Sequence, residues 1–191
     1  RAQAGGIMNI RYDVVQGSAE WFSARAGFLS ASCFGEIFTP TGKEATGAKV
    51  ENYANRLISE RITGKPCESG FSSAAMERGH IIEIEARAFY EMTFDIDVTQ
   101  VGLVENGDYS CSPDGLIMEG GQIIKGLEIK SPLAHTQIGY LKKGVLPTQY
   151  IPQVQGSMFV CEVNQWDFLS YHPDLKPLLL TIERDQEWLD N

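Results

Sequence analysis

Three side chains near the middle of the chain, Asp114, Glu128 and Lys130, have the types and the spacing that hydrolysis of a phosphodiester requires. That reaction builds negative charge on the phosphorus, and Mg²⁺ neutralises it while binding one or two carboxylates, water and substrate oxygens. A lysine beside the carboxylates can hold or deprotonate the attacking water, because burial and neighbouring charges move its pKa. The three residues therefore predict a metal site that could support phosphodiester cleavage.

The spacing brings the two carboxylates together. Asp114 and Glu128 are 14 positions apart (128 − 114), and a glycine pair between them can make the turn of a hairpin. Glu128 and Lys130 are two apart, so on a strand they point to the same face. Ile129 points the other way, into apolar packing, while its main-chain carbonyl can still serve as a hard ligand.

The same pattern has a simpler interpretation, since Glu and Lys two apart on a surface strand form an ordinary ion pair. Its context favours a functional site. Pro113 and Gly115 fix a bend at Asp114, and the strand that carries Glu128 and Lys130 is otherwise apolar. A buried carboxylate and amine are costly to maintain unless they are paired or have a role.

The elements that position these residues follow from hydrophobic periodicity and turn signals. Apolar residues recur at helical spacing in residues 49–63 and alternate in residues 98–104. Helices are expected over 18–27, 31–38, 49–63, 74–92, 133–143 and 148–161, and strands over 98–104, 109–112, 115–118, 123–129, 166–171 and 178–182. This order predicts helices, a three-strand meander, a helix pair and closing strands. The fold class is therefore α/β, with a mixed central β-sheet flanked by helices.

Length and composition bound the organisation of the chain. Its 191 residues with 43% hydrophobic content fit one compact domain, expected over residues 8–191. Residues 1–7 are small and polar and are interpreted as a tag remnant before Met8. No apolar run is long enough to cross a bilayer. The four cysteines form no Cys-x-x-Cys pair, which argues against zinc or iron–sulfur ligation and fits reduced thiols in a cytoplasm.

The formal net charge is −9, with a pI of about 4.8. This balance argues against a protein that coats nucleic acid through a broad basic face. It does not exclude an enzyme that holds phosphates through metal ions and a few cations, because a channel can be locally positive within an acidic surface. Candidates for such a lining are Lys43, Lys49, Arg56, Arg61, Lys142 and Lys143.

Several segments, taken in order, make the sequence similar to a known family. They are Trp21-Phe22, Gly79 to Glu83, Ser-Pro-Asp-Gly from Ser112, Leu-Glu-Ile-Lys-Ser-Pro from Leu127, Gln-Val-Gln-Gly-Ser-Met from Gln153, and Tyr171-His172-Pro173. They resemble the phage lambda-type exonucleases, also called YqaJ-like viral recombinases, of the restriction-endonuclease-like PD-(D/E)XK nuclease superfamily. The resemblance runs from Glu20 to about Glu183.

The resemblance implies a restriction-endonuclease-like core and a processive exonuclease that uses Mg²⁺ or Mn²⁺. Such an enzyme digests one strand of linear double-stranded DNA from its 5′ end and leaves a 3′ overhang for homologous recombination. The implied partners are double-stranded DNA ends, further copies of the chain in a trimeric ring, and a single-strand annealing protein. The implied location is the cytoplasm of a bacterial host, with the protein encoded by a phage or prophage and no membrane involved.

The resemblance also implies roles for individual residues. Asp114 and Glu128 match metal ligands, the Ile129 carbonyl assists them, and Lys130 matches the catalytic lysine. Glu83 matches an upstream acidic residue that contacts a metal ion or its water shell. On the residues alone, Glu85 competes with Glu83 for this position.

Gln153 matches a glutamine that positions the scissile region, with Gln155 as its competitor on another face of the same helix. A second group, Arg25, Ser32 and Ser112, matches residues that form a pocket for a 5′-phosphate. A guanidinium suits this task because it binds phosphate through a bidentate fork. Met76 falls where the family has an apolar wedge that splits terminal base pairs, although it could equally fill the core.

Two alternatives stay open at this point. One is a structure-specific endonuclease built on the same core, which Arg25 and Ser32 disfavour because they suggest that a DNA end is bound. The other is a non-catalytic DNA-binding or assembly module, against which the complete set of Asp114, Glu128 and Lys130 speaks.

Overall fold

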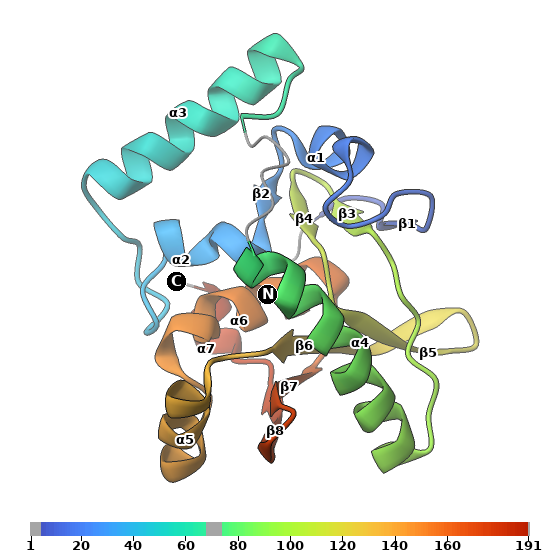
Figure 1. Ribbon diagram of the computed structural model, residues 1–191. Helices are drawn as coiled ribbons and strands as arrows, with labels where there is room; N and C mark the ends of the chain where they lie inside the picture. Colours follow the sequence, from blue (N-terminus) through green and yellow to red (C-terminus); the bar gives the residue numbers. More distant parts are fainter. Residues whose placement is uncertain (1–4, 68–73, 191) are drawn as a thin grey trace.

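The computed structural model describes residues 5–67 and 74–190, and the side chains at positions 74–78 and 80 also lie outside the described residues. Within these limits the chain forms seven α-helices, two short 3-10 helices and two four-stranded sheets (Figure 1). Each sheet is mixed, since one strand pair in each is parallel and the other pairs are antiparallel. The predicted α/β class is confirmed.

The first sheet, called here the small sheet, has the strand order β1-β3-β4-β2. Its strands are β1 (Asn9–Arg11), β3 (Leu103–Asn106), β4 (Tyr109–Cys111) and β2 (Leu29–Ser30). The second, called here the large sheet, has the order β5-β6-β7-β8. Its strands are β5 (Gly115–Glu119), β6 (Gln122–Lys130), β7 (Gln165–His172) and β8 (Leu175–Glu183).

The predicted helices begin and end close to where the sequence signals place them, although residues 31–38 divide into a 3-10 turn and a short α-helix, and α7 was not predicted. The helices are α1 (Ala19–Arg25), η1 (Ala31–Cys33), α2 (Phe34–Ile37), α3 (Ala48–Thr63), α4 (Ala74–Phe94), α5 (Ala134–Lys143), η2 (Thr148–Tyr150), α6 (Ile151–Cys161) and α7 (Gln186–Asp190). The Ser18 hydroxyl caps α1 by accepting a hydrogen bond from the Trp21 N–H at 3.1 Å. Gly64 ends α3 with a left-handed backbone at φ 65°. Among the described helices, none is both long and apolar enough to span a membrane.

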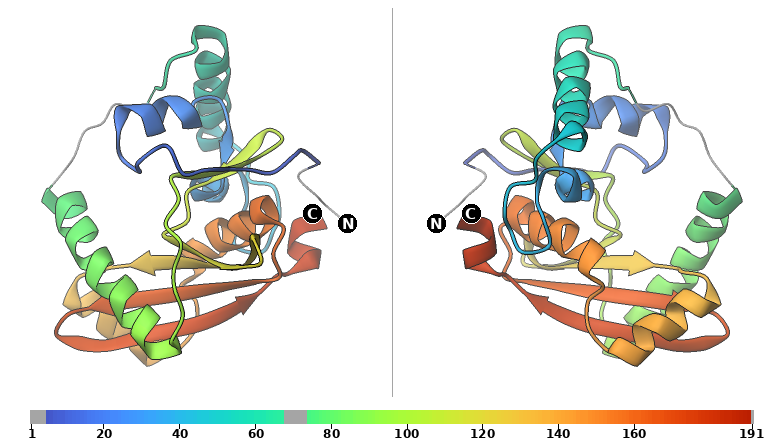
Figure 2. Two further views of the ribbon diagram at one scale, coloured as in Figure 1. Left: turned by 90° about the vertical axis from the view of Figure 1, so that its right-hand side faces the viewer. Right: turned by 90° about the vertical axis from the view of Figure 1, so that its left-hand side faces the viewer.

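Helix α6 lies between the two sheets, and α4 covers the opposite face of the large sheet (Figure 2). The core around α6 joins both sheets through Val154, Met158 and Phe168. A second, smaller core beneath α4 contains Tyr90 and Ile129. The large sheet is therefore covered on both faces, so its strands must be apolar on both sides apart from residues with a specific role.

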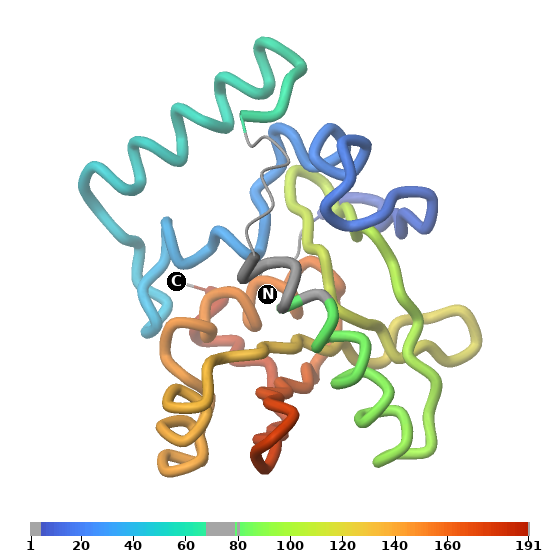
Figure 3. The backbone as a smooth tube through the Cα atoms, viewed as in Figure 1, coloured from blue at the N-terminus to red at the C-terminus, as the bar shows by residue number. Residues whose placement is uncertain are grey.

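The predicted three-strand meander is wrong. The hairpin of β3 and β4 belongs to the small sheet, whereas β5 and β6 form an antiparallel pair in the large one. The chain passes from one sheet to the other at residues 112–114 (Figure 3), where Pro113 interrupts the extended backbone. The Asp114 N–H then donates to the Leu127 carbonyl at 3.1 Å, which starts the pairing with β6.

The strand expected over residues 98–104 is also shorter than predicted. Thr99 makes an isolated bridge to Leu116 of the large sheet, and regular pairing in the small sheet begins only at Leu103. Gly102 lies between these contacts and packs against the Val14 backbone so closely that a Cβ atom would sit 2.0 Å from the Val14 oxygen. One alternating sequence thus contributes to two sheets.

Candidate active site

The β5–β6 hairpin brings Asp114, Glu128 and Lys130 together at one end of the large sheet. The Asp114 carboxylate accepts a hydrogen bond from the Ile129 N–H at 2.6 Å, and the Asp114 N–H donates to the Leu127 carbonyl. Lys130 Nζ donates to Glu128 Oε1 in an ion pair. These contacts define what we call the carboxylate centre: Asp114, Glu128 and Lys130.

Alternation along β6 places Glu128 and Lys130 on the face towards α6, and Leu127 and Ile129 on the face towards α4. Glu128 is only 2% exposed, whereas the Lys130 side chain is 26% exposed and lies at the rim. Leu127 and Ile129 point into the core beneath α4. The Ile129 N–H faces Asp114 and not β7, and the carbonyl of a strand residue points the same way as its N–H. The Ile129 oxygen is therefore directed towards the side on which Asp114 lies.

Helix α6 contributes Gln153 to this centre. Gln153 Nε2 donates to Glu128 Oε1 at 2.7 Å. Gln155 points away, since its amide donates to the Glu183 carbonyl at 3.0 Å and accepts from the Asp185 N–H at 2.9 Å. Of the two glutamines that the sequence left open, Gln153 contacts the carboxylate centre.

Helix α4 contributes Glu83 and a residue that the sequence analysis missed, Arg87. The Glu83 carboxylate forms an ion pair with Arg87 one turn further along α4, and Arg87 Nε donates to the Asp114 carbonyl at 3.1 Å. Glu85 instead accepts a hydrogen bond from the Tyr171 hydroxyl at 2.8 Å. The i,i+4 spacing of Glu83 and Arg87 was the available sequence signal for this pair. Glu83, Arg87 and Asp114 also line a cavity of about 220 Å³.

The electrostatics of the centre reflect crowded negative charge. Burial, together with the charges of Glu128 and Glu83, raises the pKa of Asp114 well above its usual value. For Lys130, burial lowers the pKa, but Glu128 and Asp114 outweigh that effect and raise it above the ordinary lysine value. A divalent cation would compensate the carboxylates, and without it Lys130 stays protonated.

The donors in the carboxylate centre fit a hard cation. Among the side chains that the structure describes, which exclude those at positions 74–78 and 80, no three His, Cys, Asp or Glu residues converge as a complete ligand set. Two carboxylates and a main-chain oxygen are nevertheless what Mg²⁺ or Mn²⁺ commonly takes from a protein, with water and substrate oxygens completing the shell. The raised pKa of Asp114 supports the same assignment, because a cation beside it would offset the nearby negative charge that disfavours its ionisation.

A second polar cluster, called here the arginine cluster, consists of Arg25, Ser32 and Ser112 with Trp21 between them. Arg25 Nη2 lies 3.3 Å from Ser32 Oγ, and the Arg25 guanidinium stacks 4.2 Å from the centre of the Trp21 ring. The indole N–H of Trp21 donates to Ser112 Oγ at 2.9 Å. The three residues named from the resemblance therefore lie together, joined by Trp21.

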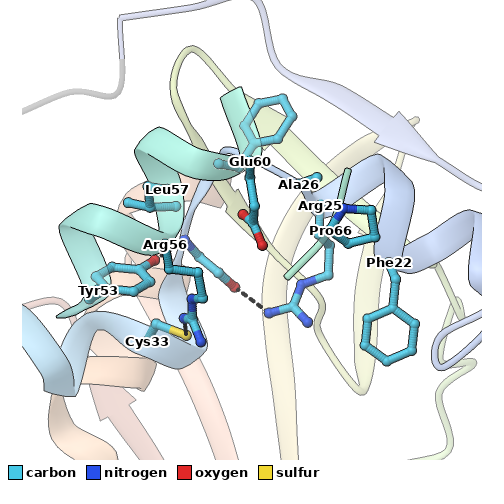
Figure 4. A pocket seen from close by; sticks show the side chains of 11 residues that line it. Phe22, Arg25, Ala26, Cys33, Tyr53, Arg56, Leu57, Glu60 and Pro66 are labelled. Carbon is cyan, nitrogen blue, oxygen red and sulfur yellow. Dashed lines mark hydrogen bonds between the residues drawn. The ribbon is translucent and has the colours of Figure 1, made fainter. Parts of the chain in front are cut away.

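Arg25 also lines a narrow pocket between α1 and α3, where Figure 4 shows the guanidinium groups of Arg25 and Arg56 approaching the same space. The other polar side chains there include Ser30, whose hydroxyl accepts from Arg25 at 3.1 Å, and Tyr53, whose hydroxyl accepts from the Ser30 N–H at 3.1 Å. Arg56 was proposed only as one of six general channel cations. The side chain of Met76, the predicted wedge, lies outside the described part of the structure.

Of the other predicted channel cations, two have structural partners. Arg61 donates to the Gly27 carbonyl at 2.8 Å and pairs with Asp108 at 3.0 Å, which ties α3 to the turn before β4. Lys49 donates to the Gly35 carbonyl at 3.0 Å.

Comparison with known proteins places this geometry in context. The model of the YqaJ-like viral recombinase domain matches residues 20–164. The alkaline exonuclease LHK-Exo from Laribacter hongkongensis has been solved alone and in complex with dAMP. The chain in the dAMP complex shares 33% sequence identity with this chain, with a TM-score of 0.77. The match covers 91% of this chain and 86% of that one. A phage-related exonuclease from Haemophilus somnus shares the fold at 14% identity, with a TM-score of 0.57 over 85% of this chain and 87% of that one.

A curated relative from Acanthamoeba polyphaga mimivirus, the uncharacterized protein R354, is 25% identical over 183 residues. The match covers 84% of this chain but only 31% of that protein. The chain therefore spans about a third of the length of this viral relative.

Proposed function

Because the chain belongs to the YqaJ-like viral recombinase domain family, we propose that it is a metal-dependent exonuclease acting on the ends of linear double-stranded DNA. It degrades one strand in the 5′-to-3′ direction and leaves a 3′ overhang. The convergence of Asp114, Glu128 and Lys130 at one end of β6 is the observation that carries this proposal. The likeness to LHK-Exo, a protein described as an alkaline exonuclease, supports it.

The carboxylate centre supplies the chemistry. Asp114 and Glu128, with the Ile129 carbonyl, would hold Mg²⁺ or Mn²⁺, and the bound ion would neutralise charge developing on the phosphate. Lys130 is protonated beside two carboxylates, so it acts first as a cation that orients the attacking water and stabilises the pentavalent phosphorus. Gln153 fixes the Glu128 carboxylate through Oε1, which keeps this ligand in one orientation.

The arginine cluster supplies recognition of the end. Arg25 can bind two oxygens of a terminal 5′-phosphate, and the hydroxyls of Ser32 and Ser112 can donate to the same group. Trp21 stacks on Arg25 and holds Ser112, so the cluster is preorganised before DNA arrives. A grip on the 5′-phosphate separate from the metal ligands is what distinguishes an end-dependent enzyme from an endonuclease.

The wider assembly follows from the same family membership. We propose that the chain forms a trimeric ring, which would retain the DNA between cuts, and that a single-strand annealing protein receives the 3′ overhang for homologous recombination. Light scattering tests the ring, because a monomeric mass at working concentrations would contradict it.

The central experiment compares a linear duplex with a covalently closed circle of the same sequence in the presence of Mg²⁺. We expect degradation of the linear duplex only, and cutting of the circle would favour the structure-specific endonuclease. A label is placed on either the 5′ or the 3′ end of the duplex. The label that is released first shows the direction of degradation. A Lys130→Ala preparation controls for contaminating nucleases.

A second comparison tests the end grip. A duplex with 5′-phosphates should be degraded faster than the same duplex with 5′-hydroxyls, and Arg25→Ala should reduce that preference. If the wild-type chain degrades both duplexes at the same rate, the arginine cluster does not bind the 5′-phosphate. DNA binding without any degradation would indicate the non-catalytic module.

A further inference from the structure

Arg87 joins the two elements that flank the carboxylate centre. It is 7% exposed, lies in the middle of α4, and uses different nitrogens for two partners. One partner is the Glu83 carboxylate, and the other is the main-chain oxygen of Asp114 at 3.1 Å. We infer that Arg87 is a positioning residue that holds Glu83 and Asp114 in register for the metal, an inference that rests on the proposed function.

The contacts of α4 separate this role from general packing. Ala86 and Tyr90 hold the helix on the sheet through the apolar core, and the Tyr90 hydroxyl donates to Asp167 at 2.6 Å. These contacts fix the helix on β6 and β7 through side chains, whereas Arg87 bonds the main chain at Asp114. Among the described side chains of α4, Arg87 is the one that bonds the Asp114 backbone, and it thereby links Asp114 to Glu83.

The charge of Arg87 has a second effect. Glu128 and Glu83 lie close enough to Asp114 for their charges to disfavour its ionised form, and the charge of Lys130 acts against them. Arg87 pairs with Glu83 and so keeps that carboxylate turned along α4. Glu83 is thereby held at the edge of the centre, where it can contact the water shell of a metal bound by Asp114 and Glu128.

The geometry also specifies why the residue is an arginine. The planar guanidinium presents Nε to the Asp114 carbonyl and Nη2 to Glu83 at the same time. A lysine carries a single nitrogen at its end. It can therefore keep the positive charge but cannot present separate nitrogens to Asp114 and Glu83. Arg87→Lys and Arg87→Met therefore separate the contribution of charge from that of geometry.

The experiment measures Mg²⁺ binding by calorimetry without DNA, thermal unfolding, and steady-state kinetics on a 5′-phosphorylated linear duplex. In Arg87→Met we expect Mg²⁺ affinity and kcat to fall roughly 10- to 100-fold, the usual effect of removing a group that orients metal ligands, with KM for DNA within about twofold. Arg87→Lys should lie between that variant and the wild type. Arg11→Met is the matched control, because it removes an arginine that lies far along the chain from the carboxylate centre and pairs with Asp13 and Glu105. In this variant Mg²⁺ affinity, kcat and KM should all stay near the wild-type values.

A double variant tests whether Arg87 acts through Glu83. Glu83→Gln combined with Arg87→Met should be no worse in Mg²⁺ affinity than Arg87→Met alone, within about twofold, because coupled residues are not additive. A lower unfolding temperature with unchanged Mg²⁺ affinity and kcat in folded Arg87→Met or Arg87→Lys protein would overturn the inference. Failure of the proposed function would look different, because the wild-type chain itself would then bind Mg²⁺ without degrading linear DNA.

Discussion

Gln153 Nε2 and Lys130 Nζ donate to the same oxygen, Oε1 of Glu128. One donor comes from α6 and the other from β6, so the carboxylate is held by two elements packed on each other. The second carboxylate oxygen is thereby given a fixed direction. Loss of a partner that orients a metal ligand in this way typically lowers metal affinity or activity by roughly 10- to 100-fold.

Replacing Gln153 tests that orientation. In Gln153→Ala we expect kcat on linear duplex to fall roughly 10- to 100-fold with little change in thermal stability, because a single donor to Glu128 is lost. Gln149→Ala is the matched control, since Gln149 lies one turn earlier and bonds only the exposed Tyr140 hydroxyl at 3.3 Å. Equal activity of the two variants would show that Lys130 alone orients Glu128.

Replacing Lys130 tests the chemistry. Lys130→Ala should retain the far-ultraviolet circular dichroism of the wild type and lose activity by roughly 10²- to 10⁴-fold, the usual contribution of a group that handles the attacking water. Lys176→Ala, at an exposed lysine of β8, serves as the charge-matched control. Near wild-type activity in Lys130→Ala would mean that the active site lies elsewhere.

Asp114 should make the metal-free protein sensitive to pH. Its folded pKa is raised above the ordinary value of 3.8, so between that value and the raised pKa the folded state binds more protons than the unfolded state. The contribution of Asp114 to stability is therefore fully present below pH 3.8 and is lost as the pH rises through this window. Lys130 adds no slope there, because its raised pKa affects stability only as the pH rises above 10.5.

Asp114→Asn should flatten that dependence. Thermal unfolding in a chelator should show the variant more stable than the wild type at neutral pH, by a few degrees, with the difference shrinking towards pH 4. Saturating Mg²⁺ should reverse the order by stabilising only the wild type, by about 2.7 kcal/mol at a hundred times the Kd. An equal response of both proteins to Mg²⁺ would contradict Asp114 as a ligand.

Asp167 should be essential for stability and not for chemistry. It is fully buried in β7 and accepts from Tyr90 at 2.6 Å, Thr181 at 2.7 Å and Lys125 at 2.8 Å. Asp167→Ala leaves the Lys125 charge without its buried partner, which costs about 3–5 kcal/mol, or roughly 6–20 °C in Tm. Asp174→Ala removes an exposed carboxylate and should have no measurable effect by calorimetry. A loss of Mg²⁺ affinity in folded Asp167→Ala protein would instead connect this residue to the site.

The sequence predicted most helices and the heart of the candidate site because both depend on local rules. Residues two apart on a strand share a face, so the meeting of Glu128 and Lys130 follows from their spacing alone. The glycine turn before β6 likewise predicts a hairpin that brings Asp114 and Glu128 close together. Caps such as Ser18 and Gly64 mark helix ends through chemistry that is local to each position.

What the sequence did not predict depends on non-local packing. The strands on either side of Pro113 have similar patterns, and nothing in them specifies that β4 pairs with β2 and β3 while β5 pairs with β6. Arg87 was missed because its partner in the Asp114 loop is a main-chain oxygen, which leaves no trace in residue identity. The choice between Gln153 and Gln155 needed the rotation of α6 between two sheets.

Ser112 and Asp114 belong to different clusters, yet only Pro113 lies between them. Two residue steps of extended chain span about 7 Å at most, and proline removes much of the freedom within that span. If the chain has the proposed function, this short backbone segment fixes the distance between the bound DNA end and the bond that is cut. The size of each released piece would then be set by covalent geometry, independent of the base sequence that passes through.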